Sequence, residues 1–159
     1  MLLMGEIDGR KGPHPGNGAD SDVRPFVHRI QVRWGDCDPA NIAYTGRIPG
    51  WALEAIEAWW EAKIGMDWYR MNVDRDMGAP FVHLTMDFRR PVTPRHPLIC
   101  EVRLIRLGRS SVRFAVRGRQ DGETCFDGEF VEAFVEAGAH RKQAVPSNIR
   151  SILEPLVTG

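Results

Sequence analysis

One long stretch of helical periodicity, roughly residues 46 to 64, constrains the fold of this 159-residue chain more than any other feature. Leu53, Ile56 and Trp60 recur at spacings of three and four residues, so the stretch has one apolar face, while glutamates and a lysine occupy the other. Gly65 follows, and glycine is the preferred residue just past a helix end. The chain therefore has one amphipathic helix, which needs an apolar surface to pack against.

That surface is predicted by strand-like segments after the helix. Asp121-Gly122 is a strong signal for a tight hairpin turn, Gly108-Arg109-Ser110 suits a short hairpin loop, and Pro94 and Pro97 bracket an earlier gap. The segments should form an antiparallel meander. The expected strands are residues 81 to 89, 98 to 107, 111 to 120 and 123 to 136, and Pro146, Ser147 and Asn148 should open a short terminal helix.

The N-terminal part of the chain divides into two regions. Residues 5 to 24 are rich in Gly, Pro, Asp and Ser and have no periodic apolar positions, so they cannot offset the entropy cost of ordering. From Phe26 to Trp34 every second residue is suited to one buried face, which predicts a first strand. We therefore expect a disordered tail over residues 1–24 and a single domain over residues 25–159.

These elements predict an α+β fold with a five-stranded antiparallel sheet wrapped around one long helix. Such a sheet covers the helix on one face only and leaves an edge strand exposed, so association of two copies is the simplest way to cover it.

Composition excludes several classes of function. Twenty-one basic side chains balance twenty-one acidic ones, so no net field attracts nucleic acid or an anionic membrane. No apolar run approaches the length needed to span a bilayer. The three cysteines, Cys37, Cys100 and Cys125, form no Cys-x-x-Cys pair, which argues against disulfides and structural zinc. We expect a cytoplasmic protein without a metal.

The segment from Val32 to Tyr44 carries the candidate chemistry, because it joins the first strand to the main helix. Pro39 biases Asp38 away from helical dihedral angles and holds its carboxylate just before the helix. The free N–H groups of a first helical turn carry a partial positive charge. A thioester carbonyl placed there would be polarised, and Asp38 could attack it or activate water.

The motif Gly35-Asp36-Cys37-Asp38-Pro39-Ala40, followed by the long helix with Trp51 near its start, resembles the hot-dog-fold acyl-CoA thioesterases, particularly the 4-hydroxybenzoyl-CoA thioesterase family. The order of elements agrees over about residues 26 to 150. The resemblance implies a hot-dog fold, hydrolysis of an acyl-CoA, a homodimer or homotetramer with active sites at subunit interfaces, and Asp38 as the catalytic aspartate. Coenzyme A would enter as part of the substrate, and no other cofactor is expected.

The same resemblance implies further site residues. The backbone amide of Thr45, seven residues after Asp38, would polarise the carbonyl, and Arg109 and Arg141 would bind the phosphates of coenzyme A through their guanidinium groups. His83, on a predicted strand, is a candidate for the acyl pocket. The chain departs from the family at Gly46, Pro49 and Gly50, which weaken the first helical turns or shift the helix start to about Pro49.

Other interpretations stay open for these residues. Asp38 could be a turn or helix-capping residue without a catalytic role, and Asp36 is better explained as a structural hydrogen-bond acceptor. Cys37 lies between two carboxylates that would raise the pKa of its thiol, so it is a poor nucleophile.

Two other functions compete with hydrolysis. A hot-dog hydratase or dehydratase would need a histidine near the helix-opening loop, and none lies between Asp36 and Glu61. A non-catalytic acyl-thioester-binding protein would keep the fold without turnover.

Overall fold

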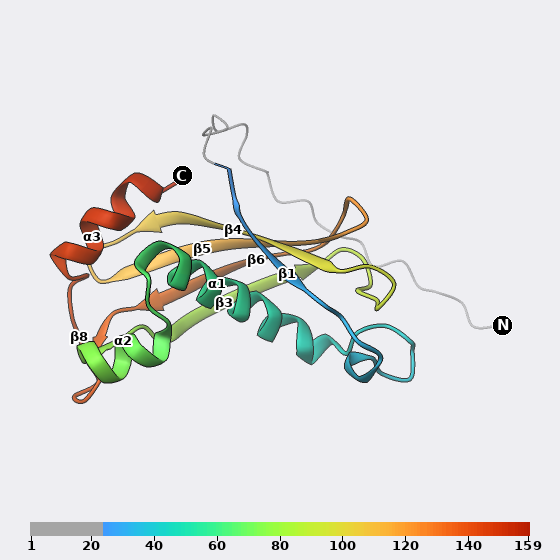
Figure 1. The fold of residues 1–159 in the computed structure, drawn as a ribbon, viewed down its shortest axis with the longest axis horizontal. Coiled ribbons are helices and arrows are strands. Elements are labelled where there is room, and N and C mark those ends of the chain that lie inside the picture. Colours follow the sequence, from blue (N-terminus) through green and yellow to red (C-terminus); the bar gives the residue numbers. More distant parts are fainter. Residues whose placement is uncertain (1–23) are drawn as a thin grey trace, which may run out of the picture.

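A five-stranded antiparallel sheet curves around one long helix, α1, in the computed structural model, which describes residues 24–159 (Figure 1). This arrangement confirms the predicted α+β hot-dog fold. The strands run in the order β1-β4-β5-β6-β3, so β1 and β3 form the two edges. The strands of this sheet are β1 Phe26–Ile30, β3 Phe81–Phe88, β4 Leu98–Leu107, β5 Ser111–Gln120 and β6 Glu123–Ala133.

A second, much smaller sheet lies beside the first and was not predicted. Its order is β2-β7-β8, with β2 at Met77–Gly78, β7 at Val135–Glu136 and β8 at Arg141–Lys142. The helical elements are η1 Trp34–Asp36, η2 Thr45–Arg47, α1 Ile48–Ile64, α2 Trp68–Arg75, α3 Ser147–Leu153 and η3 Glu154–Leu156. Among these, α1 and α3 confirm the predicted helices.

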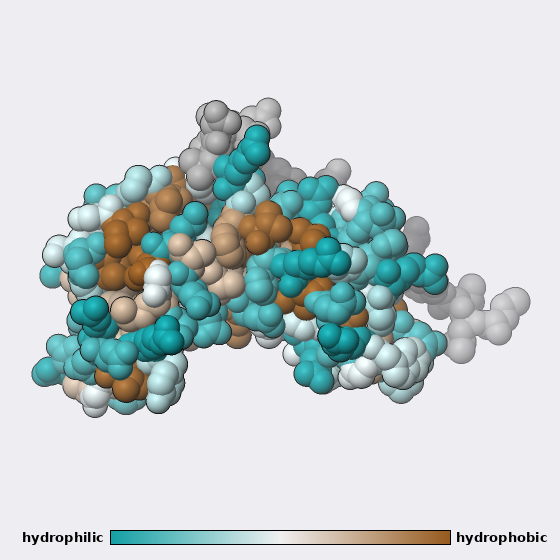
Figure 2. All heavy atoms as spheres, in the orientation of Figure 1, coloured by the Kyte–Doolittle hydropathy of each residue, from teal (hydrophilic) through white to brown (hydrophobic). Residues whose placement is uncertain are grey.

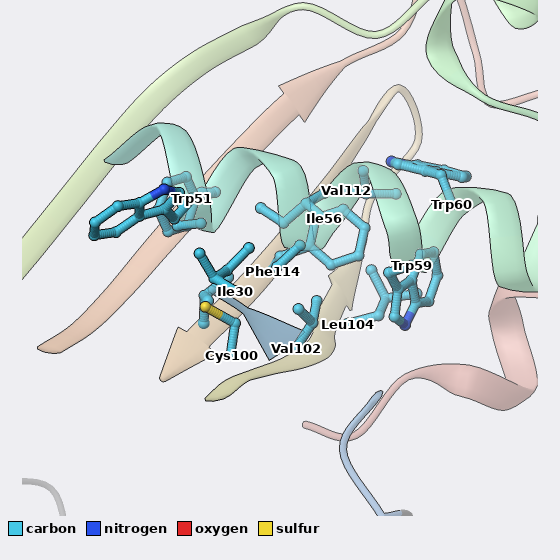
Figure 3. Close-up of a cluster of buried hydrophobic side chains, with 14 of the residues drawn as sticks. Ile30, Trp51, Ile56, Trp59, Trp60, Cys100, Val102, Leu104, Val112 and Phe114 are labelled. Atoms are coloured by element: carbon cyan, nitrogen blue, oxygen red, sulfur yellow. The ribbon is translucent and has the colours of Figure 1, made fainter. Parts of the chain in front are cut away.

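The apolar face of α1 packs on the inner face of the sheet and forms the core. Ile56 and Trp60 are fully buried against strand residues such as Phe114, whose ring meets Trp60 edge-on with centroids 5.9 Å apart (Figure 3). The helix ends at Gly65, which adopts a left-handed φ of 76° and donates its N–H to Glu61 O. Side chain spacing along the helix thus fixes which face the sheet covers.

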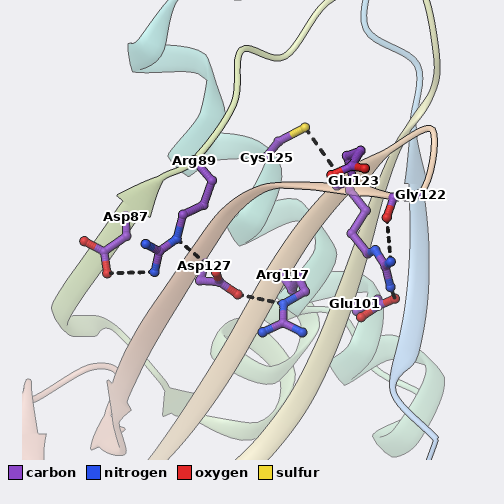
Figure 4. A network of polar contacts seen from close by, with 9 residues as sticks. Asp87, Arg89, Glu101, Arg117, Gly122, Glu123, Cys125 and Asp127 are labelled. Carbon is purple, nitrogen blue, oxygen red and sulfur yellow. Dashed lines mark hydrogen bonds and ion pairs between the residues drawn. The ribbon is translucent and has the colours of Figure 1, made fainter. Parts of the chain in front are cut away.

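The outer face of the same sheet carries charges in place of apolar side chains. Arg117 Nε donates to Asp127 Oδ1 at 2.7 Å, and Arg89 Nε reaches Asp127 Oδ2 at 3.5 Å (Figure 4). Arg119 lies 3.4 Å from Glu101 on the neighbouring strand. Because successive residues of a strand point to opposite faces, one sheet presents an apolar layer to α1 and an ion-pair layer outward.

Three predictions about the fold differ from the structure, and a fourth lies almost entirely outside the described residues. The first strand ends at Ile30 instead of Trp34, because Trp34 begins the η1 turn and is exposed. The meander covers β4, β5 and β6 only; β3 pairs with β6, and the proline-rich connection after β3 passes β6 and β5 to reach β4. The segment after Gly65 was predicted as a loop, but it contains α2, whose N-cap Asp67 accepts the Arg70 N–H at 2.7 Å. The expected tail lies outside the described residues, apart from Arg24.

In residues 24–159 no helix has both the length and the apolar character that crossing a bilayer requires.

Candidate active site

The loop between η1 and η2 is a tight hydrogen-bonded turn. Cys37 and Ala43 form an isolated antiparallel bridge, and inside it the Asp38 N–H donates to Ile42 O at 3.0 Å while the Asn41 N–H donates to Asp38 O at 2.9 Å. Asn41 takes a left-handed φ of 62°, a conformation that asparagine tolerates better than most residues. The backbone at Asp38 is therefore held from both sides of the turn.

Two further backbone bonds fix this loop to the rest of the protein. The Ala43 N–H donates to Val92 O at 2.8 Å, and the Tyr44 N–H donates to Asp36 O at 2.8 Å. Val92 is buried and follows the end of β3. The loop that carries Asp38 is thus attached to the chain segment just beyond the C-terminal end of the edge strand β3.

The carboxylate of Asp38 has one oxygen fixed and one oxygen available. Oδ1 accepts the Ala40 N–H at 2.8 Å, whereas Oδ2 makes no hydrogen bond or ion pair with the described residues. The residue is half-buried. A carboxylate held in this way can approach an electrophile or a water molecule without first breaking its own hydrogen bond.

Asp36, two residues earlier, has a different arrangement. Its Oδ2 accepts the Arg33 N–H at 2.8 Å and its Oδ1 lies 3.6 Å from Arg47 Nε. Both oxygens are therefore engaged in holding the loop, as the structural interpretation of this residue predicted. The two aspartates therefore differ in geometry: both carboxylate oxygens of Asp36 are engaged, whereas Asp38 has one oxygen without a partner among the described residues.

The entry to the helix presents unbonded N–H groups. Neither Thr45 nor Gly46 donates its backbone N–H to an oxygen of the described residues, and no side chain caps η2 or α1. A Cβ at Gly46 would lie 2.5 Å from the ring of the exposed Tyr44, so a larger residue here would require that ring to move. The helix itself begins at Ile48, near the predicted shifted start at Pro49. Polarising N–H groups thus follow Asp38 closely along the chain.

The other predicted site residues lie away from this loop within one protomer. Arg109 is exposed in the β4–β5 hairpin near α3, and Arg141 is exposed in β8, both at the opposite end of the sheet from residues 31–44 (Figure 1). Arg141 donates to Glu136 Oε2 at 2.7 Å, and this carboxylate raises the pKa of the guanidinium. His83 is exposed on β3, in register with Val131 and on the outer face of the sheet.

An apolar cavity of about 390 Å³, which we call the α2 cavity, lies at the N-terminal start of β3. The rings of Trp68 and Phe81 meet edge-on in its wall with centroids 5.5 Å apart. Neither this cavity nor α2 was predicted from the sequence, although Asp67 before Trp68 and Met71 is a capping signal that could have revealed the helix. Its remaining lining residues are Leu53, Met71, Asn72, Met77, Gly78, Ala79, Pro80, Val135, Ala137 and His140.

Next to Trp68 and Phe81 the structure buries an acidic side chain that was not predicted from the sequence. Glu132 on β6 is fully buried, and its Oε2 accepts the Trp60 indole N–H at 2.8 Å, while Oε1 has no partner. Burial raises the pKa of this carboxyl to about 8, and the indoles of Trp60 and Trp68 lower it only in part. The Trp68 N–H is also buried, without a hydrogen bond of good geometry.

The three cysteines are free thiols, as predicted, and burial raises the pKa of Cys100 to about 12. In the part of the chain that the structure describes, no three His, Cys, Asp or Glu side chains are grouped so that they could hold a metal ion.

A comparison with protein families matches residues 32–153 to the model described as thioesterase-like superfamily. The chain belongs to this superfamily. As a member of the thioesterase-like superfamily it is a thioester hydrolase, which confirms the predicted enzyme class. The assignment to the 4-hydroxybenzoyl-CoA branch stays a prediction.

Individual thioesterases are also similar to this chain. A thioesterase superfamily structure from Jannaschia sp. CCS1 is 47% identical, covers 89% of this chain and 99% of its own, and superposes with a TM-score of 0.84. A 1,4-dihydroxy-2-naphthoyl-CoA hydrolase from Prochlorococcus marinus (strain MIT 9303) is 26% identical over 79% of this chain and 87% of its own length. A 1,4-dihydroxy-2-naphthoyl-CoA thioesterase from Synechocystis, 17% identical, shares the fold with a TM-score of 0.74 over 82% of this chain and 96% of its own.

Proposed function

We propose that this thioesterase hydrolyses an aromatic acyl-CoA to the free acid and coenzyme A, with Asp38 as nucleophile or general base. The observation that carries the proposal is that only one carboxylate oxygen of Asp38 is hydrogen-bonded. Oδ1 accepts the Ala40 N–H and Oδ2 is free, on a turn that precedes the main helix. The aromatic preference is supported by the hydrolase from Prochlorococcus marinus, whose named substrate is a naphthoyl-CoA.

The reaction requires only groups of this chain and water. The thioester carbonyl oxygen would accept the Thr45 N–H, so that negative charge developing on it is stabilised. Asp38 then either attacks the carbonyl carbon, expelling the thiolate and leaving an anhydride that water cleaves, or removes a proton from the attacking water. Both routes consume one water and release a carboxylic acid and the thiol of coenzyme A.

A second copy of the chain is part of the proposal, because it would add walls around Asp38. This residue is absent from the linings of four of the most pronounced cavities among residues 24–159. The edge strand β3 is eight residues long and contains no proline. It exposes large apolar side chains, with Val82 at 61%, Leu84 at 40% and Phe88 at 49%. Such an edge is suited to pairing with another strand.

A two-fold antiparallel pairing of β3 with its copy has a favourable register. If Thr85 lies on the symmetry axis, His83 is directly opposite the partner's Asp87, and Leu84 is opposite the partner's Met86. A histidine then faces an aspartate on the outer side of the sheet, and apolar side chains face each other on the inner side. The resulting assembly is a homodimer; two such dimers would give the alternative tetramer.

This dimer also explains why the arginines lie far from Asp38 in one protomer. Antiparallel pairing would bring the end of one sheet that carries Arg109 and Arg141 towards the partner's Asp38 loop. Arg109 makes no side-chain hydrogen bond or ion pair with the described residues, so its guanidinium is available for phosphate. The exposed pair between Arg141 and Glu136 contributes little stability, and a phosphate can displace it. Both residues are proposed to bind coenzyme A in the cytosol.

The test is release of free thiol from a panel of aromatic and aliphatic acyl-CoA substrates by the Asp38→Asn variant. The amide keeps the shape of the side chain but removes its charge, so we expect turnover to fall by about a hundredfold or more. Asp121→Asn is the matched control, because Asp121 lies in a hairpin turn at φ 49° that asparagine also adopts. Unchanged turnover in Asp38→Asn would remove Asp38 from the mechanism, and no thiol release by the parent protein would favour a binding function.

A further inference from the structure

A carboxyl group and an indole N–H are buried close to each other, and each lacks a hydrogen bond. Glu132 on β6 is fully buried, and its Oε1 has no partner among the described residues. The Trp68 N–H is buried and unpartnered too, yet this indole lies close enough to lower the pKa of Glu132. Only Oε2 is well bonded, to the Trp60 N–H at 2.8 Å. Buried polar groups are normally paired, so the unpaired atoms of Glu132 and Trp68 call for an explanation.

The neighbours of Glu132 offer no positive charge to an ionised carboxylate. Burial raises its pKa, and the groups of the described residues that lower it are the indoles of Trp60 and Trp68. On the neighbouring strands Glu132 is opposite Phe81 of β3 and Val112 of β5. The titratable residues that flank these contacts along α1, α2, β3 and β5 are Glu57, Glu61, Asp67, Arg70, His83 and Arg113, none of which is buried. Ionisation without water would therefore leave an uncompensated charge in the core, which is strongly unfavourable.

Helix α2, which carries Trp68, has little apolar surface holding it to the protein. Met71 is the one buried residue among Trp68–Arg75, and six of these eight residues are exposed. Figure 2 shows a mostly hydrophilic surface at the α2 end of the molecule, at the lower left. The C-terminal end of α2 is fixed, because Asp76 Oδ1 accepts the Gly138 N–H at 2.8 Å. The start of the helix, at Trp68, is therefore the end that can move away from the sheet.

A short route for water to Glu132 leads through the α2 cavity. The rings of Trp68 and Phe81 meet edge-on in the wall of this cavity, with centroids 5.5 Å apart. Glu132 is opposite Phe81 on the next strand, and it does not itself line the cavity. Turning Trp68 outward would open this wall and let water reach the unpaired oxygen of Glu132.

We propose that α2 is a pH-sensitive flap, which stays against the sheet while Glu132 is protonated and opens at Trp68 when Glu132 gives its proton to water. Opening lets water solvate both carboxylate oxygens, whereas the closed form leaves Oε1 without a partner among the described residues. The flap is independent of the catalytic role proposed for Asp38.

The pH range of the opening follows from the two states of Glu132. The closed form keeps the proton up to a pKa of about 8, and a solvated glutamate releases it near its ordinary pKa of 4.5. The closed form is thus favoured at low pH and loses its advantage as the pH rises. Between these two values the opening equilibrium constant should rise about tenfold per pH unit, and above the higher value it should level off.

Amide hydrogen exchange of the intact parent protein tests the flap. Between about pH 6 and about pH 8 the protection of residues 68–75, corrected for intrinsic exchange rates, should fall about a hundredfold and then level off. Core amides of β5 should stay better protected than those of α2 at each pH, because they exchange only on wider unfolding. If α2 and β5 lost protection as one unit, or if the protection of α2 did not change with pH, the flap would be overturned.

A pair of variants on β6 assigns the pH dependence to one carboxyl. Glu132→Gln still accepts the Trp60 N–H but does not titrate, so the pH dependence at residues 68–75 should vanish. Glu129→Gln is the matched control, because it removes an exposed carboxylate from the same strand and should keep the parent's profile. A Glu132→Gln protein with the parent's pH dependence, or its loss in Glu129→Gln, would mean that another group drives the opening.

The Trp68 indole N–H gives the same test in the parent, should Glu132→Gln fail to fold. Its NMR signal is assigned by its loss in Trp68→Phe. Its exchange with water, corrected for the intrinsic rate, should rise with pH in step with the α2 amides. An indole N–H that stays protected up to about pH 9 would contradict the flap.

Discussion

The two edges of the sheet differ in how they meet solvent. At one edge β1 is five residues long, and its His28 Nε2 lies 3.0 Å from Glu54 of α1, so helix and strand are tied together. At the other edge β3 is eight residues long and exposes Leu84 and Phe88 without such a tie. The contrast supports the proposal that β3, and not β1, pairs with a strand of a second copy.

The two edges also differ in the residues of the strand that pairs with each. Beside β1, strand β4 places the buried Cys100 opposite His28. Beside the start of β3, strand β6 places Glu132 opposite Phe81. Burying a carboxyl costs free energy of folding, and Glu132 is buried next to the wall of the α2 cavity. The β3 side thus combines an unpaired edge, a cavity and a buried acid.

The largest effect should come from a charge on the β3 edge. Leu84→Asp places two carboxylates in the centre of the proposed interface, one from each copy. We expect the dimer dissociation constant to rise on the order of 10⁴-fold, because each unpaired charge loses solvation on association. Sedimentation equilibrium measures this change directly.

Val27→Asp on β1 is the control, since Val27 is 54% exposed and the new charge stays in water. If Leu84→Asp remains a dimer while Val27→Asp dissociates, the roles of the two edges are reversed.

A somewhat smaller effect is expected at Glu132, in the pH dependence of stability. Its pKa is about 8 in the folded protein against an ordinary value of 4.5, so the folded state keeps a proton that the unfolded chain releases. The free energy of unfolding should therefore fall as the pH rises from about 4.5 to about 8, by several kcal/mol, on the order of 4.

Glu132→Gln should remove that decline, because the amide still accepts the Trp60 N–H and does not titrate. Chemical denaturation of both proteins at several pH values provides the comparison. Parallel curves for parent and variant would mean that Glu132 ionises normally.

The smallest effect concerns the register of the β3 pairing. His83→Asp places like charges opposite each other twice per dimer, once at each end of the pairing about Thr85. Exposed like-charge pairs cost up to about 1 kcal/mol each, so we expect the dissociation constant to rise roughly tenfold to thirtyfold. Adding Asp87→Lys restores opposite charges and should restore affinity. A double variant as weak as His83→Asp would contradict this register.

Much of the fold was predictable because its signals are local. Strands β4 and β5 begin and end at the predicted residues, since Gly108 and the Asp121-Gly122 turn mark their boundaries. Both Asp121 and Gly122 adopt positive φ, as a tight hairpin turn requires. Helix α1 was predictable from its spacing and from Gly65.

The missed parts depend on contacts between distant residues. Pairing of β3 with β6 instead of β4 is set by the packing of whole strands, and no turn residue encodes it. Helix α2 is short and mostly polar, so its periodicity is weak and Trp68 resembled a loop residue. Glu132 shares the inner face of β6 with Phe126 and Phe130, but no local signal in the sequence shows that its carboxylate accepts the Trp60 N–H from the helix.

The site was predictable in its chemistry and less so in its geometry. The motif around Asp38 predicted a reacting carboxylate, which stays a prediction, and the structure shows that one oxygen of this carboxylate makes no hydrogen bond with the described residues. Arg109, Arg141 and His83 were predicted beside the same site, but one protomer does not bring them to Asp38. Sequence spacing within one chain cannot report which residues meet across an interface between two chains.

The most direct test of a site shared between two chains is the specific activity of the parent protein as it is diluted through its dimer dissociation constant. Thiol release and the dimer fraction are measured at the same concentrations, in the same buffer and with a saturating aromatic acyl-CoA. If the site is shared, activity per chain should fall in proportion to the dimer fraction. A dissociated monomer that keeps the full turnover of the dimer would contradict a shared site.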